Sequence, residues 1–199
     1  MSVTLILGPM FAGKTSALHS HIAKAMLAGK PTMLLVPNID TRYTRKALST
    51  SHDGIGLQAT RTDKLLSIAV PTNGTVVGVE EAHFFEDLPT FLVQQTQAGN
   101  HVVVAGLHAD SNRQPWPCIS QAMALADHIV FKHAVCICCG ENASCSKRIE
   151  NTQQGKVQVG GADKYVAVCN QCFYKDLTSE HLEAFQRALA RLKSKREWI

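Results

Sequence analysis

Short apolar runs alternate with longer segments of mixed polarity along the first two thirds of this 199-residue chain. The runs predict strands at residues 3–7, 33–36, 75–79, 102–107 and 128–131. Helix-length segments separate them, and the first, from Ser16 to Ala28, is rich in alanine. Apolar strands that alternate with helices are typical of a parallel sheet covered on both faces. The pattern therefore predicts an α/β fold over residues 1–133.

This rhythm stops near residue 133, and the remaining chain divides in two. Residues 134–175 contain most of the seven cysteines and a polar stretch, Glu150 to Lys156, that we interpret as a mobile loop. In residues 176–199, apolar side chains recur at helical spacing, at Leu182, Phe185, Leu189 and Leu192. We expect an amphipathic C-terminal helix from about Thr178 to Arg196. It is predicted to pack on its own domain or on a neighbouring subunit, with contact to a membrane surface or nucleic acid as the alternative.

The first predicted strand leads into a glycine-rich loop that opens the first helix. The loop has the pattern Gly-x-x-x-x-Gly-Lys-Thr and consists of Gly8, Pro9, Met10, Phe11, Ala12, Gly13, Lys14 and Thr15. Such a loop turns its backbone N–H groups inward and binds phosphate at the positive end of the helix. We expect Lys14 on the β- and γ-phosphates of a nucleoside triphosphate, and the Thr15 hydroxyl on magnesium. Residues 1–133 are thus predicted to be a P-loop NTPase-like nucleotide-binding domain; the alternative is a glycine-rich turn with an accidental Lys-Thr.

Two carboxylates, Glu80 and Glu81, follow the predicted strand at 75–79. In phosphate-loop proteins an acidic residue at this place holds magnesium or its waters, and a neighbouring acid can accept a proton from an attacking hydroxyl. Because side chains alternate along an extended chain, the two need not do the same job. The alternative is that they only begin a solvated helix. Of the aromatic pair that follows, we assign Phe84 to the site and Phe85 to the core.

Four cysteines have the spacing of a metal site. Cys136 and Cys139 form one Cys-x2-Cys knuckle, and Cys169 and Cys172 form a second. Two such knuckles are typical of a tetrahedral structural zinc site. We expect one zinc ion, which clamps the base of the Glu150–Lys156 loop.

The other three cysteines have different interpretations. Cys138 competes with Cys139 as a zinc ligand, although the spacing favours Cys139. Cys118 and Cys145 are interpreted as small apolar core residues. Cysteines beside a phosphate loop indicate the reducing interior of the cell, so we expect a cytoplasmic protein.

Charge and hydropathy restrict which partners of the protein are expected. The net charge is +4 and the pI is about 8.7, with much of the basicity in the C-terminal segment, so nucleic-acid binding is not expected. No apolar run of 18 residues exists, and the first strand begins too early for a cleaved signal, so no membrane association is expected.

Several motifs together resemble the zinc-containing thymidine kinase family. They are the phosphate loop, Asp40-Thr-Arg-Tyr43, Ser51-His-Asp53, Val79-Glu-Glu-Ala-His-Phe-Phe85, the two cysteine knuckles and Gly160-Gly-Ala-Asp-Lys-Tyr165. The resemblance covers residues 3 to about 175. It implies transfer of the ATP γ-phosphate to the 5′-hydroxyl of thymidine or deoxyuridine, with magnesium. It also implies a homotetramer, inhibited by the end product dTTP, in which a small zinc-ribbon and lasso-loop domain spans 134–175.

The resemblance assigns roles to individual residues. Glu81 matches the family's general base. Lys14, Thr15 and Asp53 match positions that handle phosphate and magnesium, and Arg113 matches an arginine that helps to organise the phosphate side. Residues that match the nucleoside pocket are Met10, Phe84, Leu107 and Tyr165. The lasso segment that reads the thymine edge through its backbone corresponds to Lys156, Val157, Gln158, Val159 and Gly160.

The chain departs from the family pattern in three places. Glu80 stands where aspartate is usual and is one methylene longer. The run His108-Ala-Asp-Ser-Asn-Arg113 replaces an Asp-Gly-Thr-Phe-Gln-Arg-like run, so that Ser111 stands where a substrate-side phenylalanine is usual and Trp116 is a candidate to refill the space. Ser146 replaces a threonine near the base. A catalytically weak or inactive domain of the same fold is therefore one alternative function, and a zinc-ribbon nucleic-acid-binding ATPase is another.

Overall fold

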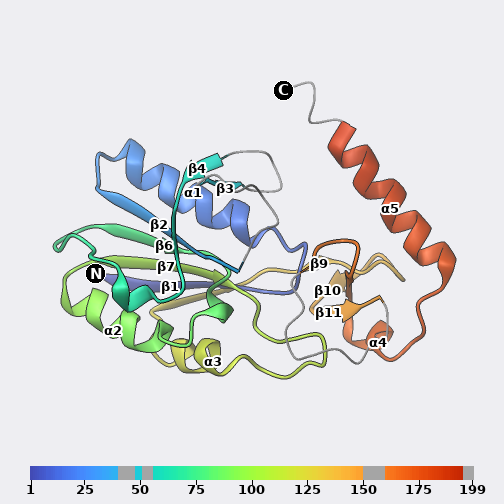
Figure 1. Ribbon diagram of the computed structural model, residues 1–199. Coiled ribbons are helices and arrows are strands. Elements are labelled where there is room, and N and C mark those ends of the chain that lie inside the picture. The colour runs from blue at the N-terminus through green and yellow to red at the C-terminus, as the bar shows by residue number, and fades with distance from the viewer. Residues whose placement is uncertain (40–47, 51–55, 150–159, 195–199) are drawn as a thin grey trace.

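A six-stranded parallel sheet forms the larger part of the molecule (Figure 1). The computed structural model describes residues 1–39, 48–50, 56–149 and 160–194. The strands lie in the order β5-β2-β6-β7-β1-β8, and every neighbouring pair is parallel. Their bounds are Ser2–Leu7 for β1, Thr32–Pro37 for β2, Thr60–Thr62 for β5, Val76–Val79 for β6, His101–Gly106 for β7 and His128–Phe131 for β8.

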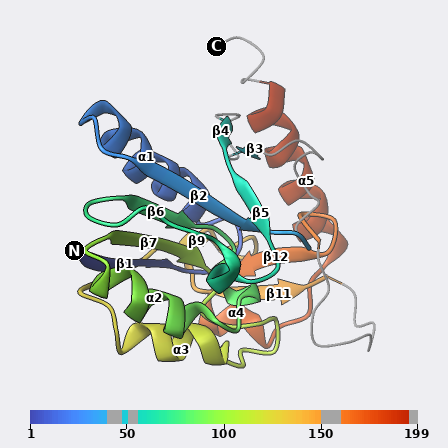
Figure 2. The same ribbon diagram turned by 60° about the vertical axis from the view of Figure 1, so that its left-hand side comes forward.

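Helices cover both faces of this sheet, as its apolar strands require. α1 lies on one face, and α2 and α3 lie on the other (Figures 1 and 2). These helices span Lys14–Leu27, Leu88–Gln97 and Pro117–Met123. Strand β1 contributes to both layers, because Ile6 packs with α1 whereas Leu5 and Leu7 pack with α2 and α3. The predicted α/β fold with helices on both sides of a parallel sheet is confirmed.

The predicted elements of the sheet agree with the structure to within two residues. The predicted strand at 128–131 coincides with β8. The first helix begins at Lys14, earlier than predicted, because Gly13 adopts φ 72° at its N-cap and the chain enters the helix directly from the glycine-rich loop. The prediction missed β5 and the antiparallel pair β3 (Leu48–Thr50) and β4 (Gly56–Gln58), which have only three residues each.

A smaller module follows β8. Two antiparallel strand pairs, β9 with β10 and β11 with β12, pack with the short helix α4 around a separate apolar cluster. The bounds are Ala134–Val135 for β9, Asn142–Ala143 for β10, Cys145–Arg148 for β11, Tyr165–Val168 for β12 and Asn170–Phe173 for α4. The long helix α5 (Ser179–Ser194) comes next, as the pattern predicts. The proposed domain limits at 133 and 175 stay a prediction.

Two further observations complete the fold. Two single 3-10 turns lie in the connections: η1 (Leu65–Ser67) between β5 and β6, and η2 (Ala82–Phe84) between β6 and α2. Among the helices that the structure describes, none combines the length and apolarity needed to cross a membrane. The polar stretch from Glu150 to Lys156 lies outside the described residues.

Candidate active site

The glycine-rich loop connects the carboxyl end of β1 to the amino end of α1. Two of its residues have left-handed backbone conformations, Phe11 with φ 65° and Gly13 with φ 72°. The Lys14 Nζ donates a 2.7 Å hydrogen bond to the Pro9 carbonyl, across the loop. The first turn of α1 carries no acidic side chain, so the positive end of the helix is not neutralised from within it. The loop is therefore suited to bind a phosphate group.

The end of β8 lies tightly against this loop. The Lys132 amide donates to the Leu7 carbonyl at 2.7 Å, and a Cβ on Gly8 would come within 2.2 Å of the Lys132 carbonyl oxygen. Gly8 thus permits a close approach that no other residue allows. His108, from the segment after β7, also contacts the loop through the Gly8 backbone. Burial lowers the pKa of His108, the hydrogen bond to the Gly8 backbone opposes this, and the charges of Lys14 and Arg113 lower the pKa further.

The two carboxylates at the end of β6 face different partners. Glu80 is buried, and its Oε2 lies 3.9 Å from Nε2 of His19 on α1. Glu81 is partly exposed in a left-handed conformation with φ 47°, and its Oε2 lies 3.6 Å from Nδ1 of His83. Of the two carboxylates, that of Glu81 is the more exposed to solvent.

Aromatic side chains lie beside Glu81. The ring of Phe84 is half-buried and packs edge-on to Trp116, with centroids 6.2 Å apart, and His83 lies next to both rings. Phe85 is fully buried in the main core. Nδ1 of His83 accepts a 3.3 Å hydrogen bond from the Leu107 amide, which joins the ends of β6 and β7. The group therefore gathers at the carboxyl ends of neighbouring parallel strands, where ligands bind in open α/β sheets.

A hairpin at residues 109–115 follows Leu107 and is held by one carboxylate. Oδ1 of Asp110 accepts hydrogen bonds from the amides of Asn112 and Gln114, both at 2.8 Å. Arg113 has φ 63° and donates a 2.9 Å hydrogen bond to the Tyr174 hydroxyl. Its guanidinium also lies 5.4 Å from the ring centroid of Phe173. The structure therefore places Arg113 against the segment after Cys172, and its predicted role on the phosphate side stays a prediction.

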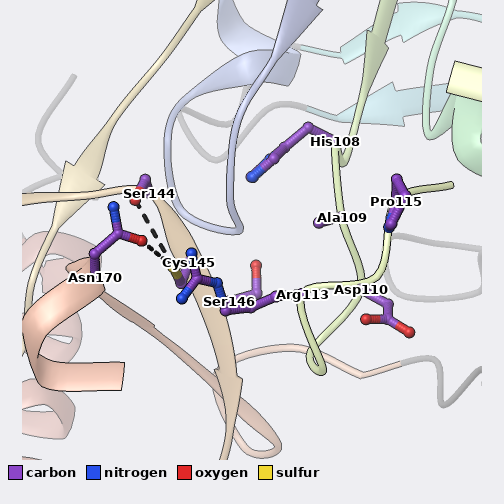
Figure 3. Close-up of a pocket in the computed structure, with 9 residues that line it drawn as sticks. All are labelled: His108, Ala109, Asp110, Arg113, Pro115, Ser144, Cys145, Ser146 and Asn170. Atoms are coloured by element: carbon purple, nitrogen blue, oxygen red, sulfur yellow. Dashed lines mark hydrogen bonds between the residues drawn. The ribbon is translucent and has the colours of Figure 1, made fainter. Parts of the chain in front are cut away.

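A cavity of about 360 Å³ separates this hairpin from the smaller module (Figure 3). Arg113 extends across it toward Cys145 and Asn170. Residues from the hairpin, β11 and α4 line the cavity: His108, Ala109, Asp110, Arg113, Pro115, Ser144, Cys145, Ser146 and Asn170. The Ser146 hydroxyl also accepts a hydrogen bond from the Met10 amide, so β11 contacts the glycine-rich loop directly.

The four cysteines predicted to bind metal come together. The sulfur atoms of Cys136, Cys139, Cys169 and Cys172 lie within 4.8 Å of one another and could hold a metal ion. Burial opposes ionisation of Cys136, but the backbone amides of the two knuckles lower its pKa to about 6, so it is a thiolate at neutral pH. Four cysteines are a ligand set of structural zinc.

The remaining cysteines also have defined places. Cys138 lies beside the cluster but is not one of its four members. Cys118 and Cys145 are both buried in apolar clusters, as predicted for small core residues. Of the two positions that compete in the sequence, Cys139 therefore belongs to the cluster and Cys138 does not.

Some predicted site residues fall elsewhere or outside the description. Asp53 and the lasso positions Lys156, Val157, Gln158 and Val159 lie outside the described residues. Gly160 is half-buried, and Tyr165 is buried at the start of β12 with the Arg148 guanidinium 5.9 Å from its ring centroid. Ser111 is half-buried in the hairpin.

The sequence interpretation missed two residues that organise the site, His83 and Asp110. The Asp-x-Asn spacing at residues 110–112 is a turn signal that could have predicted the role of Asp110. No comparable signal marks His83, because its bond to Leu107 joins residues that are far apart in the sequence.

A parallel sheet with a Gly-x-x-x-x-Gly-Lys-Thr loop after its first strand defines a nucleotide-binding protein of the phosphate-loop class. The family model described as thymidine kinase matches residues 1–173. The chain belongs to the thymidine kinase family, and the kinase relatives support a phosphotransferase enzyme.

Relatives from three kinds of source show the same similarity. The thymidine kinase of rabbit fibroma virus (strain Kasza) is 34% identical over 86% of this chain and 96% of its own length. The thymidine kinase of Porphyromonas gingivalis is 35% identical over 87% of this chain and 85% of its own. The human protein named cytosolic thymidine kinase is 32% identical over 89% of this chain and 75% of its own.

Proposed function

We propose that this chain transfers the γ-phosphate of ATP to the 5′-hydroxyl of thymidine, and also of deoxyuridine, with magnesium. The observation that carries the proposal is the position of Glu81, which stands at the carboxyl end of β6 on the same sheet edge as the glycine-rich loop. The end of β7 lies between them and touches both, through Leu107 on His83 and His108 on Gly8. Membership of the thymidine kinase family supplies the nucleoside as the acceptor.

The donor is assigned to the glycine-rich loop. The backbone N–H groups of the loop bind the β-phosphate, except at Pro9, which has none, and at Met10, whose N–H donates to Ser146. Lys14 moves from the Pro9 carbonyl to the β- and γ-phosphates. The Thr15 hydroxyl, Glu80 and Asp53 are the residues that would hold magnesium, which would supply positive charge beside the phosphates.

Glu81 acts as the general base. It accepts the proton of the 5′-hydroxyl while O5′ forms a bond to the γ-phosphorus, and the bond from that phosphorus to the bridging oxygen of ADP breaks. His83 packs beside the carboxylate, with Nδ1 3.6 Å from it, and fixes the end of β7 because the same nitrogen accepts a hydrogen bond from the Leu107 amide. The partly exposed position of Glu81 supports this assignment over Glu80, which is buried against His19.

The nucleoside is assigned to the aromatic group beside Glu81. Phe84 provides one face, and Met10, Leu107 and Tyr165 provide others. The backbone of Lys156–Gly160 reads the thymine edge. Trp116, edge-on to Phe84, supplies aromatic surface in a hairpin that has Ser111 in place of an aromatic residue.

We further propose that the four-cysteine cluster binds structural zinc. Four sulfurs within 4.8 Å of one another support a closed tetrahedral site. Its effect is mechanical, since Cys169 is the N-cap of α4 and Cys172 lies within it, and together they fix the segment that Arg113 contacts.

A homo-oligomer, a tetramer by family resemblance, completes the proposal. Strand β8 forms one edge of the sheet, and Ile129, Val130 and Phe131 on it are each at least 40% exposed. An exposed apolar edge strand is a surface that a second copy can cover. Inhibition by dTTP and a cytoplasmic location, the latter consistent with the name of the human relative, are part of the same proposal.

One experiment tests the main proposal. The protein is incubated with ATP and magnesium and with a panel of thymidine, deoxyuridine, deoxycytidine and deoxyadenosine, and nucleoside monophosphate is measured. Thymidine and deoxyuridine should be phosphorylated and the others should not. Normal ATP binding without turnover of any nucleoside would instead favour a weak or inactive member of the fold. ATP hydrolysis stimulated by single-stranded nucleic acid would favour a nucleic-acid-binding ATPase.

A further inference from the structure

Helix α5 contacts two loops of the proposed active site. Its apolar face, with Leu182 and Phe185, packs on the cluster that contains Ala12 of the glycine-rich loop and Cys172 of the metal site. Both views show its amino end beside the smaller module (Figures 1 and 2). Its first turn is fixed by Thr178, whose hydroxyl accepts a hydrogen bond from the His181 amide at 3.3 Å. The family match ends before this helix begins, so α5 is not part of the shared family region.

The first contact is made to the donor loop. The ring of Phe185 packs edge-on to the ring of Phe11, with centroids 5.4 Å apart and an angle of 72° between the planes. Phe11 has φ 65°, a conformation that a bulky residue adopts only where its surroundings hold it. Phe185 is part of those surroundings, and it lies in the half-buried face of α5.

The second contact is made to the segment before β12. Nε2 of Gln186, the residue after Phe185, donates a 3.2 Å hydrogen bond to the Ala162 carbonyl. Ala162 lies between Gly160 and Tyr165, which are both assigned to the nucleoside. Adjacent side chains of one helix therefore contact the donor loop and the nucleoside-side segment.

We propose that Phe185 and Gln186 are positioning residues, through which α5 keeps the two loops in their binding conformations. This inference rests on the proposed function. A loop that spends less time in its competent conformation binds its ligand more weakly by the same fraction, while the chemical step is unchanged once the ligand is bound. Loss of the Phe185 contact should thus raise KM for ATP, and loss of the Gln186 bond should raise KM for thymidine.

The test uses the full chain with three single substitutions. Phe185→Ala and Gln186→Ala remove the two contacts, and alanine keeps the helix intact because it has the highest helix propensity. Arg187→Ala is the matched control, since Arg187 is exposed and contacts only Glu183 of the same helix among the described residues. We expect Phe185→Ala to raise KM for ATP by about 2- to 10-fold, Gln186→Ala to raise KM for thymidine about 2- to 5-fold, and kcat to stay within about twofold of the parent in both.

Two further measurements make the outcome decisive. If Phe185→Ala lowers the melting temperature, Phe185→Leu provides a second test. Leucine keeps apolar volume at this position, so this variant should recover most of the ATP affinity. Binding of the non-hydrolysable analogue AMP-PNP tests the donor loop without turnover. If the parent phosphorylates no nucleoside, the proposed function fails, but weaker AMP-PNP binding by Phe185→Ala still supports positioning. Equal AMP-PNP affinity and equal KM values in parent, Phe185→Ala and Arg187→Ala would overturn the inference.

Discussion

The Met10 backbone amide donates a 2.9 Å hydrogen bond to the Ser146 hydroxyl, across 136 positions of the chain. Met10 belongs to the glycine-rich loop and Ser146 to β11 of the smaller module, where it is buried. The conformation of the donor loop is therefore set in part by a side chain outside the sheet domain.

Substitution of Ser146 tests this bond. Ser146→Ala leaves the Met10 amide without its acceptor, which costs about 0.5–1.5 kcal/mol. This energy corresponds to an affinity for ATP that is about 2- to 10-fold weaker. We expect KM for ATP to rise by that factor, whereas Ser146→Thr keeps the hydroxyl and should restore it. Ser120→Ala, at an exposed serine of α3, is the control and should change nothing. Equal KM values for Ser146→Ala and Ser120→Ala would contradict the role of the bond.

The assignment of the base is tested at Glu81. Glu81→Gln keeps the size and hydrogen-bonding capacity of the side chain but removes its basicity, so kcat should fall by about 10²- to 10⁴-fold while ATP binding is retained. Glu86→Gln, at an exposed glutamate a few residues later, is the matched control. Single-turnover rates are the suitable measurement. A Glu81→Gln rate within about threefold of the parent would transfer the role to Glu80 or exclude a general base.

The metal prediction concerns stoichiometry and ligand identity. Metal analysis of protein purified without added zinc should find one zinc per chain. Cys139→Ser should lose the metal and lower the melting temperature, because zinc binding energy is folding energy for the module that it holds. Cys138→Ser should retain it, since Cys138 lies beside the cluster of four and not in it. The reverse pattern, or half a zinc per chain, would show that the ligand set is wrong.

Five of the six strands of the parallel sheet were predictable because each is a short apolar run bounded by polar residues, as β8 shows at residues 128–131. The sixth, β5, has the sequence Thr-Arg-Thr and gives no such signal. The convergence of two cysteine knuckles was predictable from their spacing alone. The order of the strands in the sheet was not predictable, since it depends on which apolar faces fit together. Contacts such as Phe11 with Phe185 join residues remote in sequence and carry no local signal. The contact of Arg113 with Tyr174 was not predictable either, because the direction of the Arg113 side chain depends on a hairpin that only the structure shows.

The altered hairpin predicts a roomier nucleoside pocket. Ser111→Phe should lower KM for thymidine by roughly 10- to 150-fold with little change in kcat, because burying an aromatic ring contributes about 1.5–3 kcal/mol. Trp116→Ala should raise the same KM, because Trp116 supports Phe84 from the other side. Titrations of thymidine and deoxyuridine with each variant give the comparison. An unchanged KM in Ser111→Phe would show that position 111 does not face the nucleoside.

Gly8 provides a test of the contact between β8 and the donor loop. Gly8→Ala puts a methyl group within 2.2 Å of the Lys132 carbonyl, so the loop or the strand must move. ATP affinity should be largely lost and the melting temperature lowered. Gly74→Ala is the control, because Gly74 also has a positive φ but a methyl group there meets no atom within 4 Å. A Gly8→Ala protein that behaves like Gly74→Ala would show that the approach is not tight in solution.

The left-handed backbone of Glu81 has a consequence for the history of the sequence. A non-glycine residue in this conformation costs about 1–2 kcal/mol, whereas glycine adopts it freely. Selection for stability alone would therefore favour glycine at position 81, and under the proposed role of Glu81 it is selection for activity that keeps the glutamate. A descendant that no longer needs phosphoryl transfer should lose this residue early and become more resistant to heat as it does so.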